Sequence, residues 1–240
     1  MFERSVFIPG GLVETKEARP VLVERVDVAF EGYMPSYPQG IKQVIKQLQL
    51  TLEDVGQILE VSTKGDQAIG RSLSAFNLPI APWLKPEQVD RNIPLESLFQ
   101  SSKCFEQGRQ YPDLLRAKPW EAKTDRRLRT SGKLTGFSLR HLNQEVIREE
   151  ELNWELEPKT AFYDWIYCQS LHALVLNQGI KIEELEQTAG FSDVMWDVRR
   201  SINCQARSVA LYLALRRNNL LHTLNSKKDF LKLYEEYVID

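Results

Sequence analysis

The spacing of apolar residues changes along the chain, from the alternation of strands to the period of helices. Residues 5–10 and 20–33 are rich in β-branched and aromatic side chains, which predicts strands, and a further strand is expected at 57–65. Apolar residues at three- and four-residue steps predict the clearest helices, at 41–50, 159–179, 201–218 and 226–240. The sequence therefore predicts an α+β fold, a predominantly helical single domain with a small β element formed mainly by the N-terminal third.

The composition is that of an ordinary globular protein. Apolar residues make up 42% of the 240 residues and charged residues 27%, which is enough for a sizeable core under a charged surface. The three cysteines, Cys104, Cys168 and Cys204, lie far apart and form no C-x-x-C pair, which argues against a disulfide scaffold or a cysteine zinc site. No apolar run reaches about 18 residues, and the N-terminus lacks the features of a signal peptide. We expect a cytoplasmic protein that does not enter a membrane.

The segment 92–107 is predicted to form a helix with two neighbouring stripes. The apolar stripe contains Leu95, Leu98, Phe99, Ser102 and Phe105. Steps of four, three and four residues relate the members of a polar stripe, Glu96, Gln100, Lys103 and Gln107. A carboxylate, an amide and an ammonium on one edge of a half-buried helix suit the polar wall of a pocket. A solvated helix face without chemistry explains the same spacing.

Positive charge is concentrated in the middle of the chain, although the net charge is only −2. Eight basic residues lie between positions 116 and 140, namely Arg116, Lys118, Lys123, Arg126, Arg127, Arg129, Lys133 and Arg140. Only Glu121 and Asp125 oppose them there, and an acidic stretch follows at 145–157. Such a basic stretch can bind phosphates or a DNA or RNA backbone, or it can be an ordinary solvated face.

The segment 65–72, GDQAIGRS, is close to the P-loop pattern but departs from it twice. Arg71 stands where the motif needs lysine, and residues 73–79 are predicted to be extended where a helix should begin. We therefore expect no P-loop, although the backbone amides of a glycine-flanked turn can still bind phosphate.

Histidine chemistry has little support. His141, His172 and His222 are dispersed and belong to no metal-binding or Ser-His-Asp pattern, so the sequence predicts neither a metal nor a cofactor. Trp196 lies between Asp193 and Asp197, and an indole beside carboxylates suits a base-stacking or ribose-binding site. Ordinary burial in the core is the alternative explanation for this tryptophan.

Four segments, in their order along the chain, resemble the NADAR, or YbiA-like, N-glycosidase superfamily. They are ILEVSTKGDQAIGRSLSAFNLPI at 58–80, IPLESLFQSSKCFE at 93–106, LEQTAGFSDVMWD at 185–197 and SINCQARSVALYLALR at 201–216. The E-x-x-F-Q-x-x-K helix motif of that superfamily is intact as Glu96, Phe99, Gln100 and Lys103, and Thr188, Asp193 and Trp196 fit its T…D-x-x-W segment.

The chain departs from the NADAR pattern in places. Ala75 replaces the asparagine of the L-S-N-F segment, with Asn77 two places on, and Trp154 matches a site-lining tryptophan only across a gap. The resemblance runs from about Ile58 to Arg217 and implies a YbiA-like domain at 51–240. We expect residues 1–50 to form a strand-and-helix extension packed on that domain.

The resemblance implies a hydrolase of N-glycosidic bonds. Members cleave phosphoribosyl-amino intermediates of riboflavin synthesis or remove ADP-ribose from modified guanine in nucleic acid. By resemblance Glu96 is the principal acid–base residue, and Asp193 and Trp196 hold the ribose or base. Lys103 either orients a phosphate or Glu96, the role placed first, or attacks the opened sugar as a Schiff-base nucleophile. The other expected substrate-binding residues are Gln100, Asn77, Gly70, Arg71, Trp154 and Asn203.

Elementary chemistry agrees with these roles. Breaking a C1′–N bond builds positive charge on the ribose, so a carboxylate beneath the sugar stabilises the transition state. The same carboxylate, or Asp193, can activate the attacking water. Two alternatives remain, a non-catalytic module that binds ADP-ribose or a nucleotide, and a nucleic-acid-binding accessory protein that uses the 116–140 stretch.

Overall fold

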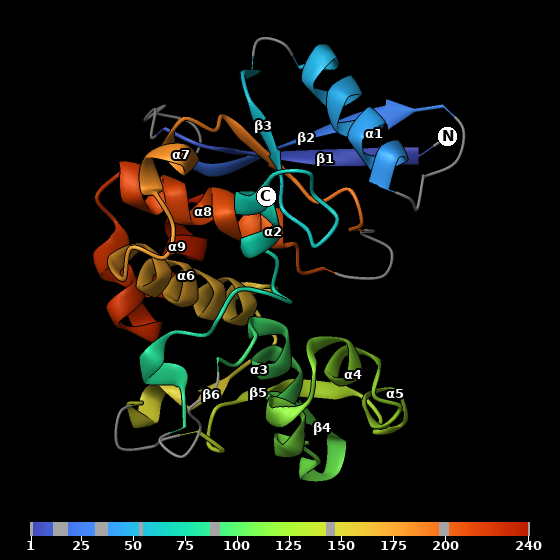
Figure 1. Ribbon diagram of the computed structural model, residues 1–240. Helices are drawn as coiled ribbons and strands as arrows, with labels where there is room; N and C mark the ends of the chain where they lie inside the picture. The colour runs from blue at the N-terminus through green and yellow to red at the C-terminus, as the bar shows by residue number, and fades with distance from the viewer. Residues whose placement is uncertain are drawn as a thin grey trace.

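A five-stranded mixed sheet forms one part of the protein (Figure 1). The computed structural model describes residues 2–11, 19–31, 38–52, 55–86, 92–142, 147–196 and 202–239. The strands lie in the order β3-β7-β1-β2-β8, and their bounds are Phe2–Pro9 (β1), Val21–Phe30 (β2), Ile58–Glu60 (β3), Gly190–Ser192 (β7) and Val238–Ile239 (β8). β1 pairs antiparallel with β2 and β7, whereas β3 and β8 join parallel to β7 and β2. Strands from both ends of the chain therefore meet in one sheet.

Helices cover both faces of this sheet. Val6 and Phe7 are neighbours on β1 and are both buried, so their side chains point to opposite faces. The Val6 face packs against α1 (Pro38–Thr51), whose Ile41, Val44 and Leu48 are buried with it. The Phe7 face packs against α8 (Gln205–Arg217), and this side belongs to the larger core.

A second sheet lies in the middle of the sequence and on the far side of the molecule (Figure 1). Its strands are antiparallel, in the order β4-β5-β6, with bounds Lys103–Phe105, Leu134–Ser138 and Asn153–Trp154. Three helices accompany it, α3 (Leu95–Ser101), α4 (Pro119–Thr124) and α5 (Arg127–Thr130). The prediction that strands fall mainly in the N-terminal third is therefore incomplete, and the fold is mixed, with helices and two sheets.

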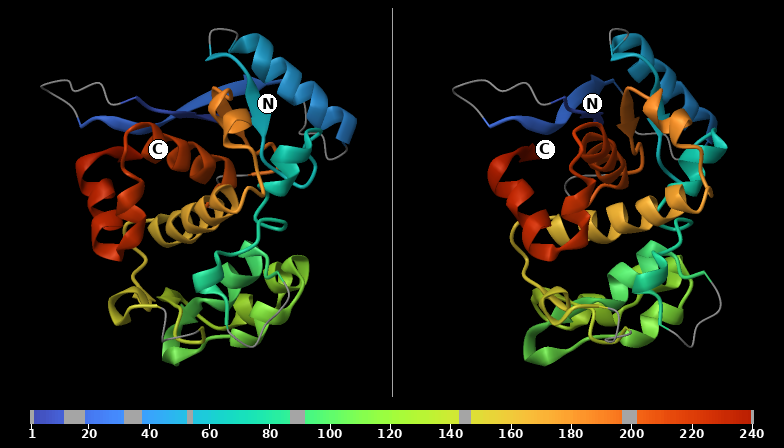
Figure 2. Two further views of the ribbon diagram at one scale, coloured as in Figure 1. Left: turned by 60° about the vertical axis from the view of Figure 1, so that its left-hand side comes forward. Right: turned by 90° about the vertical axis from the view of Figure 1, so that its left-hand side faces the viewer.

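Helix α6 (Ala161–Leu176) lies between these two parts (Figure 2). Every residue from Ala161 to Leu171 is buried, as expected of a helix that packs against other elements on all sides. It packs against α8, α3 and α9 (Lys227–Glu236), so it connects the two halves of the core. The remaining elements are α2 (Ala68–Ser72), α7 (Ile182–Glu186) and short 3-10 helices at Pro82–Leu84, Glu106–Gly108, Pro112–Arg116, Glu149–Glu151 and Leu221–Asn225.

Most predicted elements are found with different bounds, β1 and α1 longer and the others shorter than predicted. The strands at 5–10 and 20–33 are β1 and β2, and the helices at 41–50, 159–179, 201–218 and 226–240 are α1, α6, α8 and α9. The prediction of extended chain at 73–79 is wrong, because this segment is a series of turns that follows α2. No helix in the described part of the chain is long and apolar enough to cross a membrane.

A buried ion pair ties α6 to the C-terminal part of the chain. The Asp164 carboxylate on α6 accepts a hydrogen bond from Arg207 on α8 and a second, of 2.7 Å, from the Tyr234 hydroxyl on α9. Ser208 donates a further hydrogen bond of 2.5 Å to the other carboxylate oxygen. Arg207 also donates to the Ile239 carbonyl of β8 at 2.9 Å. One carboxylate therefore holds three helices and the last strand in register.

We expect the Asp164→Ala variant to lose about 3–5 kcal/mol of unfolding free energy, because removal of one member of a buried ion pair leaves the Arg207 charge uncompensated. Urea denaturation followed by tryptophan fluorescence and circular dichroism measures this loss. The Ser208→Ala variant is the matched control, and it should lose about 1 kcal/mol, the value of one hydrogen bond. A loss in Asp164→Ala no larger than that in Ser208→Ala would contradict the central role of this ion pair.

Candidate active site

Helix α3 places the Glu96 carboxylate inside the protein. The start of the helix is fixed by the preceding turn, since Leu95 and Glu96 donate backbone hydrogen bonds of 2.9 Å to the carbonyls of Leu78 and Ala75. Glu96 is only 5% exposed. Its Oε1 atom accepts a 2.8 Å hydrogen bond from Gln100 Nε2, one helical turn later. The motif residues Glu96 and Gln100 therefore form one buried polar pair.

Two ammonium groups lie near this carboxylate. Lys123 of α4 places its Nζ atom 4.0 Å from Glu96 Oε1 and 5.2 Å from the centre of the Phe76 ring. Lys103 places its Nζ atom 4.8 Å from the centre of the Phe99 ring. Burial lowers the pKa of Lys103, the negative charge of Glu96 opposes this, and the positive charge of Lys123 adds to it. Lys103 is therefore a desolvated amine beside a carboxylate.

The expected single helix over 92–107 is wrong, although its main residues stay together. Helix α3 ends at Ser101, and Lys103 begins strand β4, where it pairs with Phe137 of β5. Gln107 is exposed and adopts a left-handed backbone conformation with φ of 62°, so it does not continue the polar stripe. Lys103 reaches the neighbourhood of Glu96 from a strand rather than from the next helical turn.

Asp193 lies in a turn that follows strand β7. Its Oδ1 atom accepts a 3.1 Å hydrogen bond from the Met195 backbone, and its carbonyl accepts one of 3.0 Å from the Trp196 backbone. Burial raises the pKa of Asp193 from 3.8 to about 6, whereas the Met195 hydrogen bond, the positive charge of Lys123 and a hydrogen bond from Gln205 oppose this rise. The carboxyl group therefore changes its charge close to neutral pH.

A buried tyrosine connects Asp193 with Glu96. Tyr163 of α6 contacts the Phe99 ring edge-on, with a centroid distance of 5.1 Å. Burial raises the pKa of Tyr163 well above its usual value, and the negative charges of Glu96 and Asp193 raise it further. Lys123 likewise acts on both Asp193 and Lys103. Four of the charged groups, Glu96, Lys103, Lys123 and Asp193, thus lie close enough to affect one another or the same buried tyrosine.

Glu60 at the end of β3 supports the turn that carries Asp193. It is 2% exposed, and both of its carboxylate oxygens accept from the Val194 backbone, at 3.1 and 3.0 Å. Burial and the negative charge of Asp193 raise the pKa of Glu60 well above its usual value. The Glu60 carboxylate therefore fixes the residue next to Asp193 and is affected by the Asp193 charge.

The indole of Trp196 packs against the five-stranded sheet. It contacts the Phe7 ring of β1 edge-on at 5.9 Å, and the Arg25 guanidinium of β2 lies 5.4 Å from its centre. Its Nε1 atom is buried and has no hydrogen-bond partner among the described residues. A role for Trp196 in holding ribose or base stays a prediction.

Side chains of the region hold the glycine-flanked segment 65–72 in place. Arg71 Nη1 donates to the carbonyls of Gly65 and Asp66 at 2.8 and 2.7 Å, and Asn77 Nδ2 donates to the Arg71 carbonyl at 2.8 Å. A Cβ atom on Gly70 would lie 2.0 Å from the Glu60 carbonyl oxygen, so α2 approaches β3 closely only with glycine at this position. These contacts give all three residues a structural role, and their part in substrate binding stays a prediction.

Trp154 and Asn203 are the last two of the expected substrate-binding residues. Trp154 is 4% exposed, donates a 2.9 Å hydrogen bond to the Glu151 carbonyl, and packs against Phe162 and Trp165 at 5.6 and 5.1 Å. It therefore belongs to the aromatic core beneath β5 and β6. Asn203 is half-buried just before α8. Their expected roles in substrate binding remain untested predictions.

Three residues of this region were not singled out from the sequence. Lys123 was only one of eight basic residues, and Tyr163 sits in a helix with too many buried residues to distinguish one. Gln205 accepts a 2.8 Å hydrogen bond from the Ala75 backbone and donates one of 2.6 Å to the Val61 carbonyl. It thereby joins the L-S-N-F-like segment, the end of β3 and α8. Spacing along the chain carries no signal for such long-range contacts.

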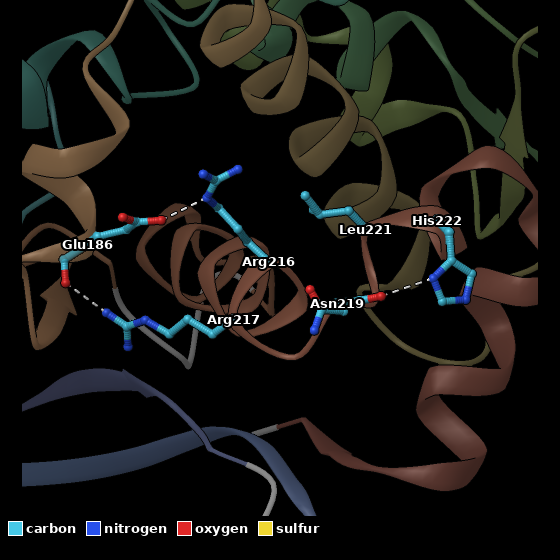
Figure 3. Close-up of a pocket in the computed structure, with 6 residues that line it drawn as sticks. All are labelled: Glu186, Arg216, Arg217, Asn219, Leu221 and His222. Carbon is cyan, nitrogen blue, oxygen red and sulfur yellow. Dashed lines mark hydrogen bonds and ion pairs between the residues drawn. The ribbon is translucent and has the colours of Figure 1, made fainter.

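A pocket of about 420 Å³ lies elsewhere, at the C-terminal end of α8 (Figure 3). It is lined by Glu186, Arg216, Arg217, Asn219, Leu221 and His222. Arg216 Nε donates to Glu186 Oε1 at 2.8 Å, and Arg217 donates to the Glu186 carbonyl at 3.0 Å. Positive charge at a helix C-terminus is stabilising, so these arginines are explained as a clamp between α7 and α8. No predicted site residue lines this pocket.

Within the described ranges, no group of three or more histidine, cysteine, aspartate or glutamate side chains is arranged to hold a metal ion. The two buried cysteine thiols are unreactive for a different reason. Burial raises the pKa of Cys168 and Cys204 well above the usual value, so neither is a ready thiolate.

We expect the Asp193 carboxyl to titrate with a midpoint near pH 6, because burial disfavours its charged form. Carbon-13 NMR of the aspartate side chains across a pH series measures this, and the Asp193→Asn variant assigns the resonance. Asp27 is the internal control. Burial acts to raise its pKa, but hydrogen bonds from Ser5 and Arg25 outweigh this effect and lower the pKa below 3.8. An Asp193 midpoint near 3.8 would show that this carboxyl is not desolvated.

Comparison with known proteins gives one family. No curated protein matches the chain. The family of DarT1-associated NADAR antitoxins matches residues 2–240, which is nearly the whole sequence and includes the N-terminal strands β1 and β2. The NADAR resemblance carried by Glu96, Gln100 and Lys103 is thereby confirmed, and the chain belongs to the DarT1-associated NADAR antitoxin family.

Proposed function

We propose that this protein is a hydrolase that removes ADP-ribose from a guanine base of nucleic acid by cleaving the N-glycosidic bond. NADAR membership supports a glycohydrolase that acts on ADP-ribosyl compounds. The antitoxin description of its family suits an enzyme that reverses a toxic modification. Among the substrates that the resemblance implies, ADP-ribosylated guanine therefore ranks ahead of a phosphoribosyl-pyrimidine intermediate.

The observation that carries this proposal is the buried Glu96 carboxylate with ammonium groups and an amide beside it. As the bond between C1″ of the ribose and the guanine nitrogen breaks, positive charge develops on the sugar. A fixed carboxylate in a site of low dielectric stabilises that charge more strongly than water does. The guanine nitrogen takes a proton as it leaves, and the elements of water finally add to C1″ and to the base.

Asp193 suits the role of general base. A base is most effective when its pKa lies near the working pH, and burial raises the pKa of Asp193 to about 6. At pH 7 most molecules would then carry the charged form, which can take a proton from water. Glu60 acts only through Asp193, by fixing the Val194 backbone and by its own charge.

We expect Glu96→Gln to lower kcat about 10²–10⁴-fold, because the amide has nearly the same shape but neither the negative charge nor the proton-transfer ability. The assay measures release of ADP-ribose from a guanine-ADP-ribosylated DNA oligonucleotide by liquid chromatography. Glu106→Gln, an exposed glutamate in the same part of the chain, is the matched control and should keep full turnover.

Two outcomes would decide against the proposal. Unchanged turnover in Glu96→Gln would remove Glu96 from the mechanism. Tight calorimetric binding of ADP-ribose by the wild-type protein, without release from any conjugate, would instead favour the non-catalytic binding module.

The sequence placed the orienting role of Lys103 first, but we expect Lys103 to act as a nucleophile, because burial lowers its pKa and increases the fraction of neutral amine. The amine attacks C1″ as the guanine leaves, the ribose ring opens to an imine, and water hydrolyses the imine to release ADP-ribose. Cyanoborohydride should therefore trap a covalent ADP-ribosyl adduct on the wild-type protein, detected by mass spectrometry.

Lys103→Arg separates this role from simple orientation, because arginine keeps the positive charge but is not a nucleophile. The variant should lose both the adduct and most turnover, whereas Lys123→Arg should keep the adduct. Substantial turnover in Lys103→Arg, together with no adduct in the wild type, would assign Lys103 the orienting role instead.

A further inference from the structure

The side-chain amide of Gln205 lies where several parts of the candidate site meet. Gln205 is the half-buried first residue of α8. Its Oε1 atom accepts hydrogen bonds from the Ala75 backbone at 2.8 Å and from the Ser74 hydroxyl at 3.4 Å. Its Nε2 atom donates to the Val61 carbonyl at 2.6 Å and to the Asp193 carboxyl. A side-chain amide has two N–H donors and two acceptor lone pairs, so these four bonds fix its orientation completely.

The bond to Ala75 connects Gln205 with Glu96. Ala75 is buried, and its carbonyl accepts a 2.9 Å hydrogen bond from the Glu96 backbone in the first turn of α3. The backbone of Ala75 is thus held by Gln205 at its N–H and by Glu96 at its carbonyl. Gln205 therefore helps to set the place at which α3 begins and from which the Glu96 side chain extends.

The bond to Val61 connects Gln205 with the backbone before Asp193. The Val61 N–H donates a 2.8 Å hydrogen bond to the carbonyl of Ser192, which directly precedes Asp193. Gln205 thus reaches Asp193 in two ways, through the backbone of Val61 and Ser192 and directly at the carboxyl group. One amide is therefore bonded toward both acids of the site.

The direct bond also favours the charged form of Asp193. A donated hydrogen bond stabilises a carboxylate, so Gln205 opposes the rise in the pKa of Asp193 that burial causes. The other titratable groups that act on Asp193 or are affected by its charge are Glu60 of β3, Lys123 of α4, Tyr163 and Tyr167 of α6, and Cys204 before α8. The tyrosines and the cysteine are neutral near pH 6, because burial raises the pKa of each well above its usual value.

We propose that Gln205 is a positioning residue that fixes the Glu96 and Asp193 carboxyl groups relative to each other and keeps Asp193 in the charged form that a base requires. This inference rests on the proposed function and adds to it a residue that acts through both acids. Gln205 needs no contact with the substrate for this role.

The first test needs neither turnover nor a folded variant. In nitrogen-15 NMR spectra of the wild type, the Gln205 side-chain amide should shift with the same midpoint as the Asp193 carboxyl, near pH 6. Gln169 is the internal control, because its buried amide on α6 donates to the Leu224 carbonyl instead. Its resonance should not move in this range. A Gln205 amide that stays constant while Asp193 titrates would overturn the inference.

The second test uses Gln205→Met, which keeps the approximate length of the side chain but removes its hydrogen bonds. The Asp193 midpoint should rise by about 1–2 pH units, the shift that corresponds to losing one hydrogen bond to a charged group. Gln169→Met is the matched control. It also loses a buried hydrogen bond, but it should leave the Asp193 midpoint unchanged. An unchanged midpoint in Gln205→Met would contradict the proposed role.

The third test is the pH dependence of ADP-ribose release. The base must be charged to accept a proton, so a higher pKa moves the acid limb of the kcat/KM profile to higher pH. From a starting pKa of about 6, kcat/KM of Gln205→Met should fall about 5- to 25-fold more at pH 6 than at pH 8. A merely structural role would lower kcat/KM by the same factor at both pH values, and that result would reject Gln205 as a positioning residue.

Failure of the proposed function is recognised separately, since the wild type would then release no ADP-ribose at any pH. The two NMR tests measure Asp193 and Gln205 without a substrate. They therefore still decide whether Gln205 controls the charge of Asp193.

Discussion

The burial of helix α6 between the two sheets is the packing on which the rest of the structure depends. Consecutive residues of this helix reach opposite neighbours: Tyr163 contacts Phe99 of α3, and Asp164 binds Arg207 of α8. Because α6 is largely buried and packs against both α3 and α8, and α8 packs against β7, it sets the position of α3 relative to the turn that begins at Asp193. Residues nearly one hundred positions apart thereby share one site without relying on a mobile loop.

This arrangement also sets the electrostatics of the site. Burial disfavours every charged form, so it moves acids and amines in opposite directions. The pKa of Asp193 rises to about 6 and that of Lys103 falls, which brings both groups closer to neutral pH. Lys123 is more exposed, and its positive charge opposes the rise in the pKa of Asp193, whereas the negative charge of Asp193 raises the pKa of Glu60 further. A base and an amine with converging pKa values are what proton transfer and nucleophilic attack require.

Local patterns predicted the elements whose burial can be read from their own residues. The alternation of β1 and β2 and the helical periods of α1, α6, α8 and α9 reflect burial that each segment carries in its own residues. The three-stranded sheet was missed because its strands contain only two to five residues, too few for a readable alternation. Lys103 continues a helical stripe by spacing alone, but its pairing with Phe137, supplied by a distant segment, ends the helix.

In the candidate site, too, the sequence identified residues that belong to a local motif and missed residues whose roles come from distant contacts. The family motif identified Glu96, Gln100, Lys103 and Asp193, whose neighbourhood the structure brings together. It did not identify Lys123 or Gln205, because their roles arise from contacts between α4 or α8 and segments far along the chain. Arg71 and Asn77 were expected to bind substrate, yet a short glycine-containing loop also needs donors for its own carbonyls, and both side chains donate to carbonyls of this region.

Polar atoms that the fold leaves unsatisfied support the same location for the site. Among the described residues, three buried side-chain atoms have no hydrogen-bond partner: Gln100 Oε1, Trp196 Nε1 and Trp165 Nε1. Each such atom costs about 1–3 kcal/mol. Trp165 lies in the aromatic core, but Gln100 and Trp196 belong to the two motifs that the sequence assigns to the substrate. The Gln100 amide that donates to the buried Glu96 carboxylate therefore keeps an unpaired acceptor, which is hydrogen-bonding capacity that a substrate can use.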